Sequence, residues 1–403
     1  MPQSTAMQFF KDVSLSAATA GFVAVLVGFT SSVAIVFQAA QGFGATPEQI
    51  ASWMWALGLG MGLCSLVPSL LLRQPVMIAW STPGAAVLAT AGVAGGFSMA
   101  EAIGAFLVCA ALITIAGATG WFERVMNRIP AEIAAALLAG VLARFGMQAF
   151  TAMQTALPLV LVMLGSYLLA RRLLARYAVV VTLAAGVAWA AARGQMRWDA
   201  VQWELAMPVF TAPQFSMAAL MSLALPLFIV TMASQNLPGV AVMRASGYQF
   251  PVSRLLTMTG IATLLLAPFG AFALNFSAIT AAICMGPEAH PDPARRYTAA
   301  ASCGLLYIGV GIFGAVVTGL LTAFPQELVV AIAGLALLGA IGGGLASALA
   351  GESHREAALI TFLVTLSGVT LAGIGSAFWG VVAGSAALFV QQYGSSRAKA
   401  ARP

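Results

Sequence analysis

The sequence is dominated by long apolar runs that are joined by short connections. In runs such as 156–170 the apolar residues follow one another, without the polar alternation of a β-barrel strand. A helix that crosses a bilayer needs about 20 such residues. Only 7% of the 403 residues are charged, whereas a soluble domain of ordinary composition has about a quarter. The sequence therefore predicts an all-α polytopic membrane protein and excludes a soluble fold.

The bilayer length divides the chain into about 14 predicted membrane segments. The stretch Thr46-Pro47-Glu48-Gln49 is a helix-start signal for the second segment, and Ser98 and Glu101 form a capping-box pattern at the start of the fourth. We expect the segments at 14–38, 47–72, 75–91, 99–119, 131–148, 156–175, 177–193, 214–234, 253–270, 271–285, 297–320, 326–347, 356–373 and 375–392.

The basic residues give this arrangement an orientation. With a cytoplasmic N-terminus, 15 of the 18 Lys and Arg residues fall on the cytoplasmic side, and Arg144, Arg193 and Arg197 fall on the outer side. Cytoplasmic loops of membrane proteins carry this excess of positive charge. We therefore expect both termini in the cytoplasm and interpret the net charge of +6 as a topology signal rather than as a nucleic-acid-binding one.

Two sequence features recur at the same offset. Pro130 and Pro325, each followed two residues later by a glutamate, are 195 residues apart, and so are Thr82 and Ser277. Equal offsets indicate a tandem repeat. Each half has seven predicted segments, an odd number, so the second half is predicted to be inverted relative to the first, as in many secondary transporters.

The third and tenth segments are each predicted to be broken into a short extended strand and a half-helix. Residues 75–80 and 271–276 look extended. Thr82 and Ser277 are the predicted N-caps of the helices that follow, and Pro83 suits the first helical position after Thr82. A helix N-terminus inside the membrane presents N–H groups and positive dipole to an anion. The candidate ligand-binding residues are Ser81, Thr82, Gly84, Asn275, Phe276, Ser277 and Ala278; the alternative is that these are packing contacts between helices.

Further polar and aromatic residues extend this candidate site. Gln235 and Asn236 end the eighth predicted segment, where they either bound the site or lie at the membrane edge. Phe29, Trp80, Phe228 and Phe276 are candidates for lining an aromatic pocket. No Lys or Arg is predicted in mid-segment, so the site would suit a small monoanion held by helix dipoles and neutral donors.

Glu132 and Glu327 are the one repeat-related pair of acids, each in the first turn of a predicted helix. They are candidates for proton coupling, although an acid also stabilises a helix N-terminus by electrostatics alone. No phosphate-binding loop, metal-ligand cluster or catalytic acid pair is present, so we expect no cofactor and no metal, and we do not expect an enzyme.

Several motifs resemble the benzoate–proton symporter (BenE) family of bacteria over nearly the whole chain. They are the stretches 81–86, 233–239 and 279–284, and the specific stretch 286–297 that begins Gly-Pro-Glu-Ala-His. The resemblance implies proton-driven benzoate import across the inner membrane. It also implies likeness to nucleobase–cation symporters and sulfate-permease-type anion transporters, which have core and gate domains.

By that likeness the core domain comprises residues 13–119 and 214–320, the gate domain comprises 120–195 and 321–393, and 394–403 form a basic cytoplasmic tail. Nucleobase symporters of the wider group commonly have a glutamate on segments eight and ten. Here 234–236 and 275–277 contain no acid, which favours an anionic substrate.

The sequence thus predicts a secondary active transporter that takes up benzoate with protons by alternating access, in contact with lipid and compatible with a homodimer. A transporter of another small anion or of a nucleobase on the same fold is the alternative. A membrane-embedded enzyme is the least favoured, because catalytic acids and metal ligands are absent from the sequence.

Overall fold

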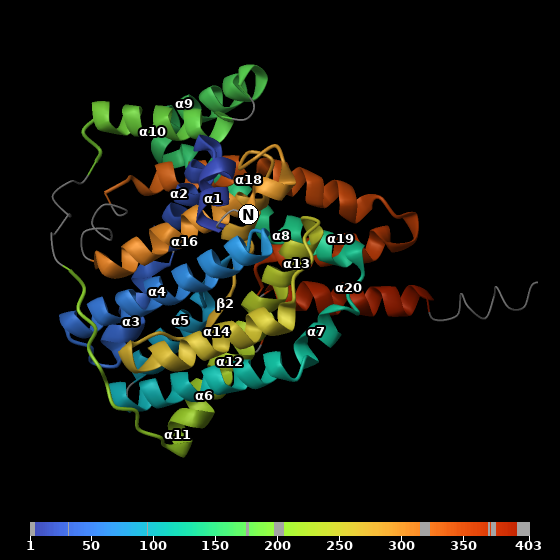
Figure 1. Ribbon diagram of the computed structural model, residues 1–403. Coiled ribbons are helices and arrows are strands. Elements are labelled where there is room, and N and C mark those ends of the chain that lie inside the picture. The colour runs from blue at the N-terminus through green and yellow to red at the C-terminus, as the bar shows by residue number, and fades with distance from the viewer. Residues whose placement is uncertain are drawn as a thin grey trace, which may run out of the picture.

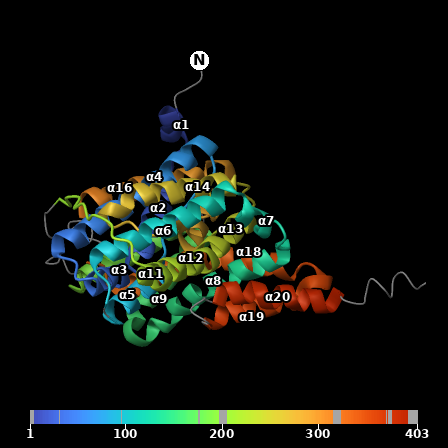
Figure 2. The same ribbon diagram turned by 90° about the horizontal axis from the view of Figure 1, so that it is seen from below.

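The computed structural model describes residues 5–30, 32–94, 96–174, 177–196, 205–314, 323–369, 371 and 376–392. The tail predicted at 394–403 lies outside these residues. Figure 1 shows long helices stacked side by side, and Figure 2 shows the same stack turned by 90°. Seven helical segments of the described chain are long and apolar enough to cross a membrane: Pro47–Leu72, Met99–Ala118, Ala131–Thr151, Met153–Leu173, Met217–Ala245, Val252–Phe269 and Gln326–Leu349.

One group of helices and strands comes from 5–126 and 217–312. Its members are α1 (Thr5–Asp12), α2 (Leu15–Thr30), α3 (Val33–Gly42), α4 (Pro47–Leu72), β1 (Ile78–Trp80), α5 (Thr82–Ala94), α6 (Met99–Ala118), α7 (Trp121–Met126), α11 (Met217–Ala219), η3 (Leu220–Ala224), α12 (Leu225–Thr231), η4 (Met232–Asn236), α13 (Leu237–Ala245), α14 (Val252–Leu266), η5 (Ala267–Phe269), β2 (Leu274–Phe276), α15 (Ala278–Met285), η6 (Pro293–Arg295) and α16 (Tyr297–Ile312). Within it α16 packs on α4, and α14 packs on α6 (Figure 1).

The other group comes from 131–192 and 326–392. Its members are α8 (Ala131–Thr151), α9 (Met153–Leu173), α10 (Ala178–Ala192), α18 (Gln326–Leu349), η7 (Glu352–His354), α19 (Arg355–Ser367) and α20 (Ser376–Gln392). Helix α18 packs along α8, and α19 packs on both α8 and α20. The two groups meet where α18 contacts α2 and where α13 contacts α8.

The capping box predicted at Ser98 forms, and a second capping box forms at the predicted helix start at Thr46. The Thr46 hydroxyl accepts from the Gln49 N–H at the start of α4, and the Ser98 hydroxyl accepts from the Glu101 N–H at the start of α6. Each box pairs helix N–H groups that would otherwise lack a partner. These local contacts explain why the predicted starts of both helices agree with the structure.

Two predicted segments have different bounds. The stretch 14–38 forms two helices, α2 and α3, and the Ser32 hydroxyl between them donates back to the Gly28 carbonyl at 3.1 Å, a contact that bends helices. The segment predicted to end at 234 instead continues to Ala245. Gln235 and Asn236 are therefore interior to a long helical segment, not at its end. They lie in η4, a π-helical turn, and such turns are frequent at functional sites.

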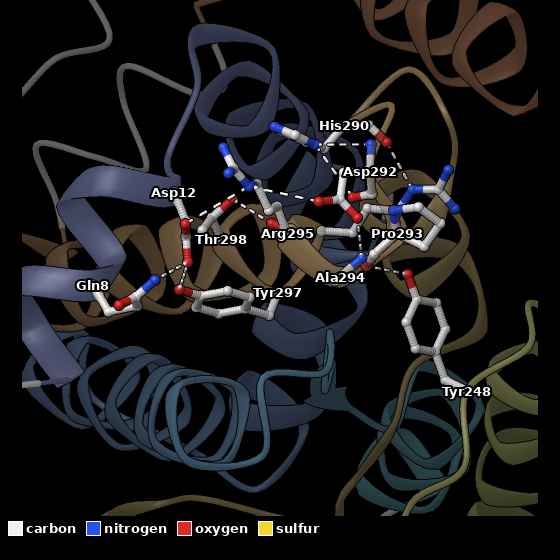
Figure 3. A network of polar contacts seen from close by, with 11 residues as sticks. Gln8, Asp12, Tyr248, His290, Asp292, Pro293, Ala294, Arg295, Tyr297 and Thr298 are labelled. Carbon is white, nitrogen blue, oxygen red and sulfur yellow. Dashed lines mark hydrogen bonds and ion pairs between the residues drawn. The ribbon is translucent and has the colours of Figure 1, made fainter. Parts of the chain in front are cut away.

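A polar network joins the N-terminal helix α1 to the start of α16 (Figure 3). Asp12 accepts a hydrogen bond from the Tyr297 hydroxyl at 2.8 Å and another from the Gln8 amide at 3.3 Å. The Arg295 guanidinium lies 3.7 Å from the same carboxylate. Tyr297 and Arg295 belong to the family-like stretch 286–297, so part of that stretch is accounted for by this contact.

Candidate functional site

Two short strands from distant parts of the chain form the centre of the first group. β1 pairs antiparallel with β2, with Ala79 opposite Asn275. Serine side chains of α4 satisfy the outer edge of the first strand, because the Ser65 hydroxyl both accepts from the Ile78 N–H and donates to its carbonyl. Extended backbone inside a membrane protein is tolerated only when buried and paired in this way.

Backbone N–H groups of the second strand, β2, are paired by side chains from η4 and α14. The Phe276 N–H donates to the Asn236 side-chain oxygen at 3.0 Å, and the Leu274 N–H donates to the Thr263 hydroxyl at 3.3 Å. Gly239 allows this close approach, since a Cβ there would lie 2.6 Å from the Phe276 Cβ. Each strand is followed directly by a helix, α5 after β1 and α15 after β2.

The start of α5 is capped by Ser81 rather than by Thr82. The buried Ser81 hydroxyl accepts from the Gly84 N–H at 3.1 Å and also accepts from the Thr231 hydroxyl at 2.8 Å. Thr82 is the first residue of the helix. The prediction of Thr82 as the cap is therefore wrong by one residue, because the serine hydroxyl reaches the N–H three residues ahead.

The start of α15 is arranged differently. Ser277 occupies the predicted cap position with extended backbone, but its side chain makes no capping hydrogen bond. Its hydroxyl instead accepts from the Thr280 hydroxyl at 2.6 Å. The Ser277 N–H donates to the Met77 carbonyl at 3.0 Å. At the other end of α15, Arg296 donates to the Met285 carbonyl at 2.8 Å, which pairs one of the last carbonyls of the helix.

A cavity of about 920 Å³ lies between the two groups of helices. Both helix starts, α5 and α15, line it from one group, and α8, α18, α19 and α20 line it from the other. The lining combines an apolar surface with ten polar or charged side chains, and sites for small ligands likewise combine apolar and polar groups. The polar and aromatic lining residues are Trp80, Thr82, Arg144, Phe145, Gln148, Ser234, Gln235, Ser277, Thr280, Phe324, Gln326, Thr365 and Ser376.

Five predicted site residues line this cavity: Trp80, Thr82, Gln235, Ser277 and Ala278. The other predicted residues lie behind the lining. Phe29 is fully buried with its ring centroid 5.7 Å from that of Trp80, and the Trp80 indole donates to the Ser32 hydroxyl at 2.9 Å. Ser81 and Gly84 are buried at the start of α5, and Phe228 packs against the buried apolar side chains. These residues hold the lining in place.

Asn236, Asn275 and Phe276 are also buried away from the cavity. Asn236 supports β2 through the bond to Phe276, and its amide donates to the Met232 sulfur at 3.2 Å. The Asn275 amide donates to the Ala273 carbonyl at 2.9 Å. These hydrogen bonds of the two asparagines are all to the protein itself.

Arg144 corrects the expectation of a site without a fixed positive charge. It is the fourteenth residue of α8, with an exposed side chain, and it lines the cavity. Of the described residues that line the cavity, Arg144 is the one with a charged side chain. Gln148 lies one turn further along the same helix and lines the same cavity. A polar pair four residues apart in an otherwise apolar helix is the sequence signal that would have found this face.

The two candidate proton-coupling acids lie outside the lining. Glu132, in the first turn of α8, has a carboxylate oxygen 3.3 Å from the His354 Nδ1. Glu327, in the first turn of α18, adjoins the lining residue Gln326. Within the described part of the chain, no three His, Cys, Asp or Glu side chains form a group that could hold a metal ion.

Such an arrangement belongs to a membrane transport protein, and comparison with known proteins supports this class. The family model described as "Benzoate membrane transport protein" matches residues 11–390, so the chain belongs to that family. It is 39% identical over 380 residues to the "Benzoate membrane transport protein" of Acinetobacter baylyi, with 94% of this chain and 96% of that protein covered. It is 49% identical over 365 residues to "Inner membrane protein YdcO" of Escherichia coli, with 91% and 93% covered.

Two solved structures match most of this chain at low sequence identity. The transmembrane domain of the cyanobacterial bicarbonate transporter BicA is 12% identical, with 92% of this chain and 97% of that chain covered and a TM-score of 0.47. SLC26A9 is 11% identical, with 90% and 66% covered and a TM-score of 0.48.

Proposed function

We propose that this protein imports benzoate or a closely related aromatic monocarboxylate together with protons, by alternating access across the bacterial inner membrane. The observation that carries the proposal is the single cavity lined by the starts of both α5 and α15. Two helix N-termini that face one space favour a negative ligand. The family membership and the name of the Acinetobacter relative support benzoate as that ligand.

In the proposed bound state the carboxylate lies between Thr82 and Ser277 and takes hydrogen bonds from backbone N–H groups and hydroxyls. The ring packs on Trp80, whose own orientation is held by Phe29 and by the bond to Ser32. Gln235 bounds the site from η4. The apolar lining excludes water from the ring, and the polar lining fixes the position of the carboxylate.

The two groups of helices are the proposed core and gate domains of a seven-plus-seven inverted repeat, with β1–α5 and β2–α15 as the broken segments. Helices α8 and α18 start at 131 and 326, the offset found in the sequence, which supports the repeat. With both termini in the cytoplasm, the cavity-lining part of α8 belongs to the outer half of the membrane. Transport then needs the core to move relative to the gate, with different ligand affinities in the two states.

Two routes for the proton remain open to experiment. In the first, Glu132 or Glu327 is protonated; the Glu132 carboxylate lies 3.3 Å from the His354 Nδ1, a nitrogen with which it can exchange a proton, and this contact supports the route. In the second, the proton crosses on the carboxylic acid of the substrate. The absence of a carboxylate among the described lining residues supports the second route.

Uptake by purified protein in proteoliposomes tests the proposal. We expect labelled benzoate to accumulate when the outer solution is made acidic, and to exchange against unlabelled benzoate without a gradient. Labelled uracil, sulfate and bicarbonate serve as competing substrates. Uptake of one of these without any uptake of benzoate would reject the proposal, and chemical conversion of benzoate would favour an enzyme.

A further inference from the structure

Arg144 is held in the cavity by its surroundings. Gly368 ends α19 in the left-handed conformation, with φ of +72°, and a Cβ at this glycine would lie 2.8 Å from the guanidinium carbon and 2.8–2.9 Å from two of its nitrogens. Any larger residue at 368 would therefore displace the guanidinium. The C-terminal end of a helix carries partial negative charge, so α19 attracts the guanidinium without neutralising it as a carboxylate would.

No carboxylate within the described residues forms an ion pair with Arg144. The ion pairs of the described chain join Arg171 to Glu288, Arg295 to Asp12 and Asp292, and His354 to Glu132. Helix α8 rises about 1.5 Å per residue, so Arg144 lies about 20 Å from the helix start. An arginine at such a depth in a membrane-spanning helix is costly, and its usual explanation is a ligand or a pathway for one.

The corresponding position of the paired helix differs in charge. Gly339 is the fourteenth residue of α18, as Arg144 is the fourteenth residue of α8. A Cβ at Gly339 would lie 3.0 Å from a carboxylate oxygen of Glu288, so an acid occupies the space beside this glycine. One helix of the pair therefore offers a guanidinium to the cavity, while the other has a carboxylate next to it.

We propose that Arg144 is a specificity-determining residue, whose guanidinium pairs with the carboxylate of a monoanionic ligand in this cavity. A guanidinium can donate two parallel hydrogen bonds to one carboxylate, which selects an acid over its neutral amide. The corresponding position in α18 is a glycine, so this attraction comes from the α8 side of the cavity. The inference rests on the proposed function, since it assigns the carboxylate of that substrate.

The test measures binding of benzoate and of neutral benzamide to the purified protein by calorimetry. We expect Arg144→Gln to weaken benzoate binding by about tenfold or more and to change benzamide binding less than twofold. Arg144→Lys keeps the positive charge but cannot donate two parallel hydrogen bonds from one planar group. Its benzoate affinity should therefore lie between those of the wild type and Arg144→Gln. Raising the salt concentration should weaken benzoate binding to the wild type more than to Arg144→Gln.

Arg193→Gln is the matched control, because it removes one positive charge that the sequence assigns to the same side of the membrane. Arg193 lies over the Trp189 ring, 5.2 Å from the ring centroid, and does not line the cavity. Its benzoate affinity should equal that of the wild type. Size-exclusion profiles and melting temperatures show whether each variant is folded.

The binding results distinguish the proposed role of Arg144 from the proposed transport of benzoate. If the wild type binds benzoate and folded Arg144→Gln binds it equally well, the role of Arg144 is wrong and the proposed function stands. The role is also wrong if Arg144→Gln weakens benzoate and benzamide by the same factor. If the wild type binds no benzoate, both the function and the inference are rejected.

Discussion

The guanidinium of Arg171 forms an ion pair with the carboxylate of Glu288, 117 residues further along the chain. Arg171 is in the last turn of α9, and Glu288 follows α15 in the loop that leads to α16. The Glu288 side chain is only 6% exposed, and that of Arg171 is 43% exposed. The pair therefore joins the proposed gate domain to the loop that directly follows one of the two site-forming helices.

Breaking this pair is expected to favour the other access state. Glu288→Gln or Arg171→Gln removes an interaction that holds the two groups of helices together in the described arrangement. Because Arg171 is partly exposed, we expect a loss of about 1 kcal/mol, which is about a fivefold change in the ratio of the two states. Maleimide labelling of a cysteine introduced at Gly339 measures the change, because Gly339 lies against Glu288.

The exchanged pair Arg171→Glu with Glu288→Arg is the control for this ion pair. It should restore the wild-type labelling rate, because the attraction is rebuilt with the charges reversed. Arg172→Gln changes the neighbouring exposed arginine and should leave labelling unaltered. Faster labelling in the exchanged protein, equal to that of the single variants, would contradict a role for the ion pair.

Ser277 gives a direct test of the cavity. Ser277→Trp fills the space at the start of α15, and we expect it to abolish benzoate binding in a protein that still folds. Ser277→Ala removes the acceptor of the Thr280 hydroxyl and one proposed hydroxyl donor to the ligand but keeps the space and the backbone N–H groups, so we expect it to weaken binding by less than about tenfold. Calorimetric titration with benzoate measures both variants. Wild-type affinity in folded Ser277→Trp would show that the ligand binds elsewhere.

Gln235 and Asn236 are consecutive residues, but we expect one to affect ligand binding and the other to affect stability. Asn236→Ala leaves the buried Phe276 N–H without its acceptor, so we expect a loss of about 1–3 kcal/mol in the free energy of unfolding. Gln235→Ala changes the cavity lining and should weaken benzoate binding with little loss of stability. Thermal unfolding and benzoate titration on both variants check this. A binding defect in Gln235→Ala that is fully explained by unfolding would contradict the assignment.

The contrast between these two residues shows what the sequence could predict. The polar cluster around them was visible in the sequence, but neighbouring residues of a helix point about 100° apart, so only the packing decides which one faces the cavity. The bounds of α4 and α6 were predictable because their capping boxes are contacts between residues three positions apart. Local signals of this kind need no knowledge of the partner helix.

The cavity-lining position of Arg144 could not be predicted, for the same physical reason. The distribution of Lys and Arg assigned it to the outer side, but it could not show that the side chain faces a cavity between α8 and the starts of α5 and α15. Likewise, Asn275 and Phe276 are adjacent to Ser277 in sequence, yet strand pairing with β1 turns both into the buried interior. The candidate positions came from the sequence, and the distinction between lining and support came from the packing.

The Asp12 network predicts how stability depends on pH. Burial raises the pKa of the Asp12 carboxyl, but the hydrogen bonds from Tyr297 and Gln8 and the charges of Arg295 and Arg73 together lower it below its ordinary value of 3.8 (Figure 3). The folded protein therefore favours the carboxylate more than the unfolded chain does. This contribution to stability is present above about pH 4 and is lost as the pH falls through the lowered pKa.

Asp12→Asn removes that contribution at neutral pH. We expect a loss of about 1 kcal/mol at pH 7, seen as a fall in Tm of about 2 °C, and no difference from the wild type once Asp12 is protonated at low pH. Thermal unfolding in detergent between pH 3 and pH 7 measures this. Asp292→Asn is the matched control, since Asp292 is more exposed and lies 3.6 Å from Arg295 within the same loop. A constant difference between Asp12→Asn and wild type across that range would contradict the linkage.

Variants of Glu132 and Glu327 distinguish the two proposed routes for the proton. Glu132→Gln breaks the contact with His354, and Glu327→Gln neutralises the repeat-related acid, while neither change alters the cavity lining. If one of them carries the proton, that variant should keep benzoate exchange but lose accumulation driven by an acidic outer solution. Glu352→Gln, an exposed acid in η7 close to His354 in sequence, is the control and should accumulate benzoate normally. Normal accumulation in both Glu132→Gln and Glu327→Gln, and in the double variant, would leave transport of the protonated acid as the route.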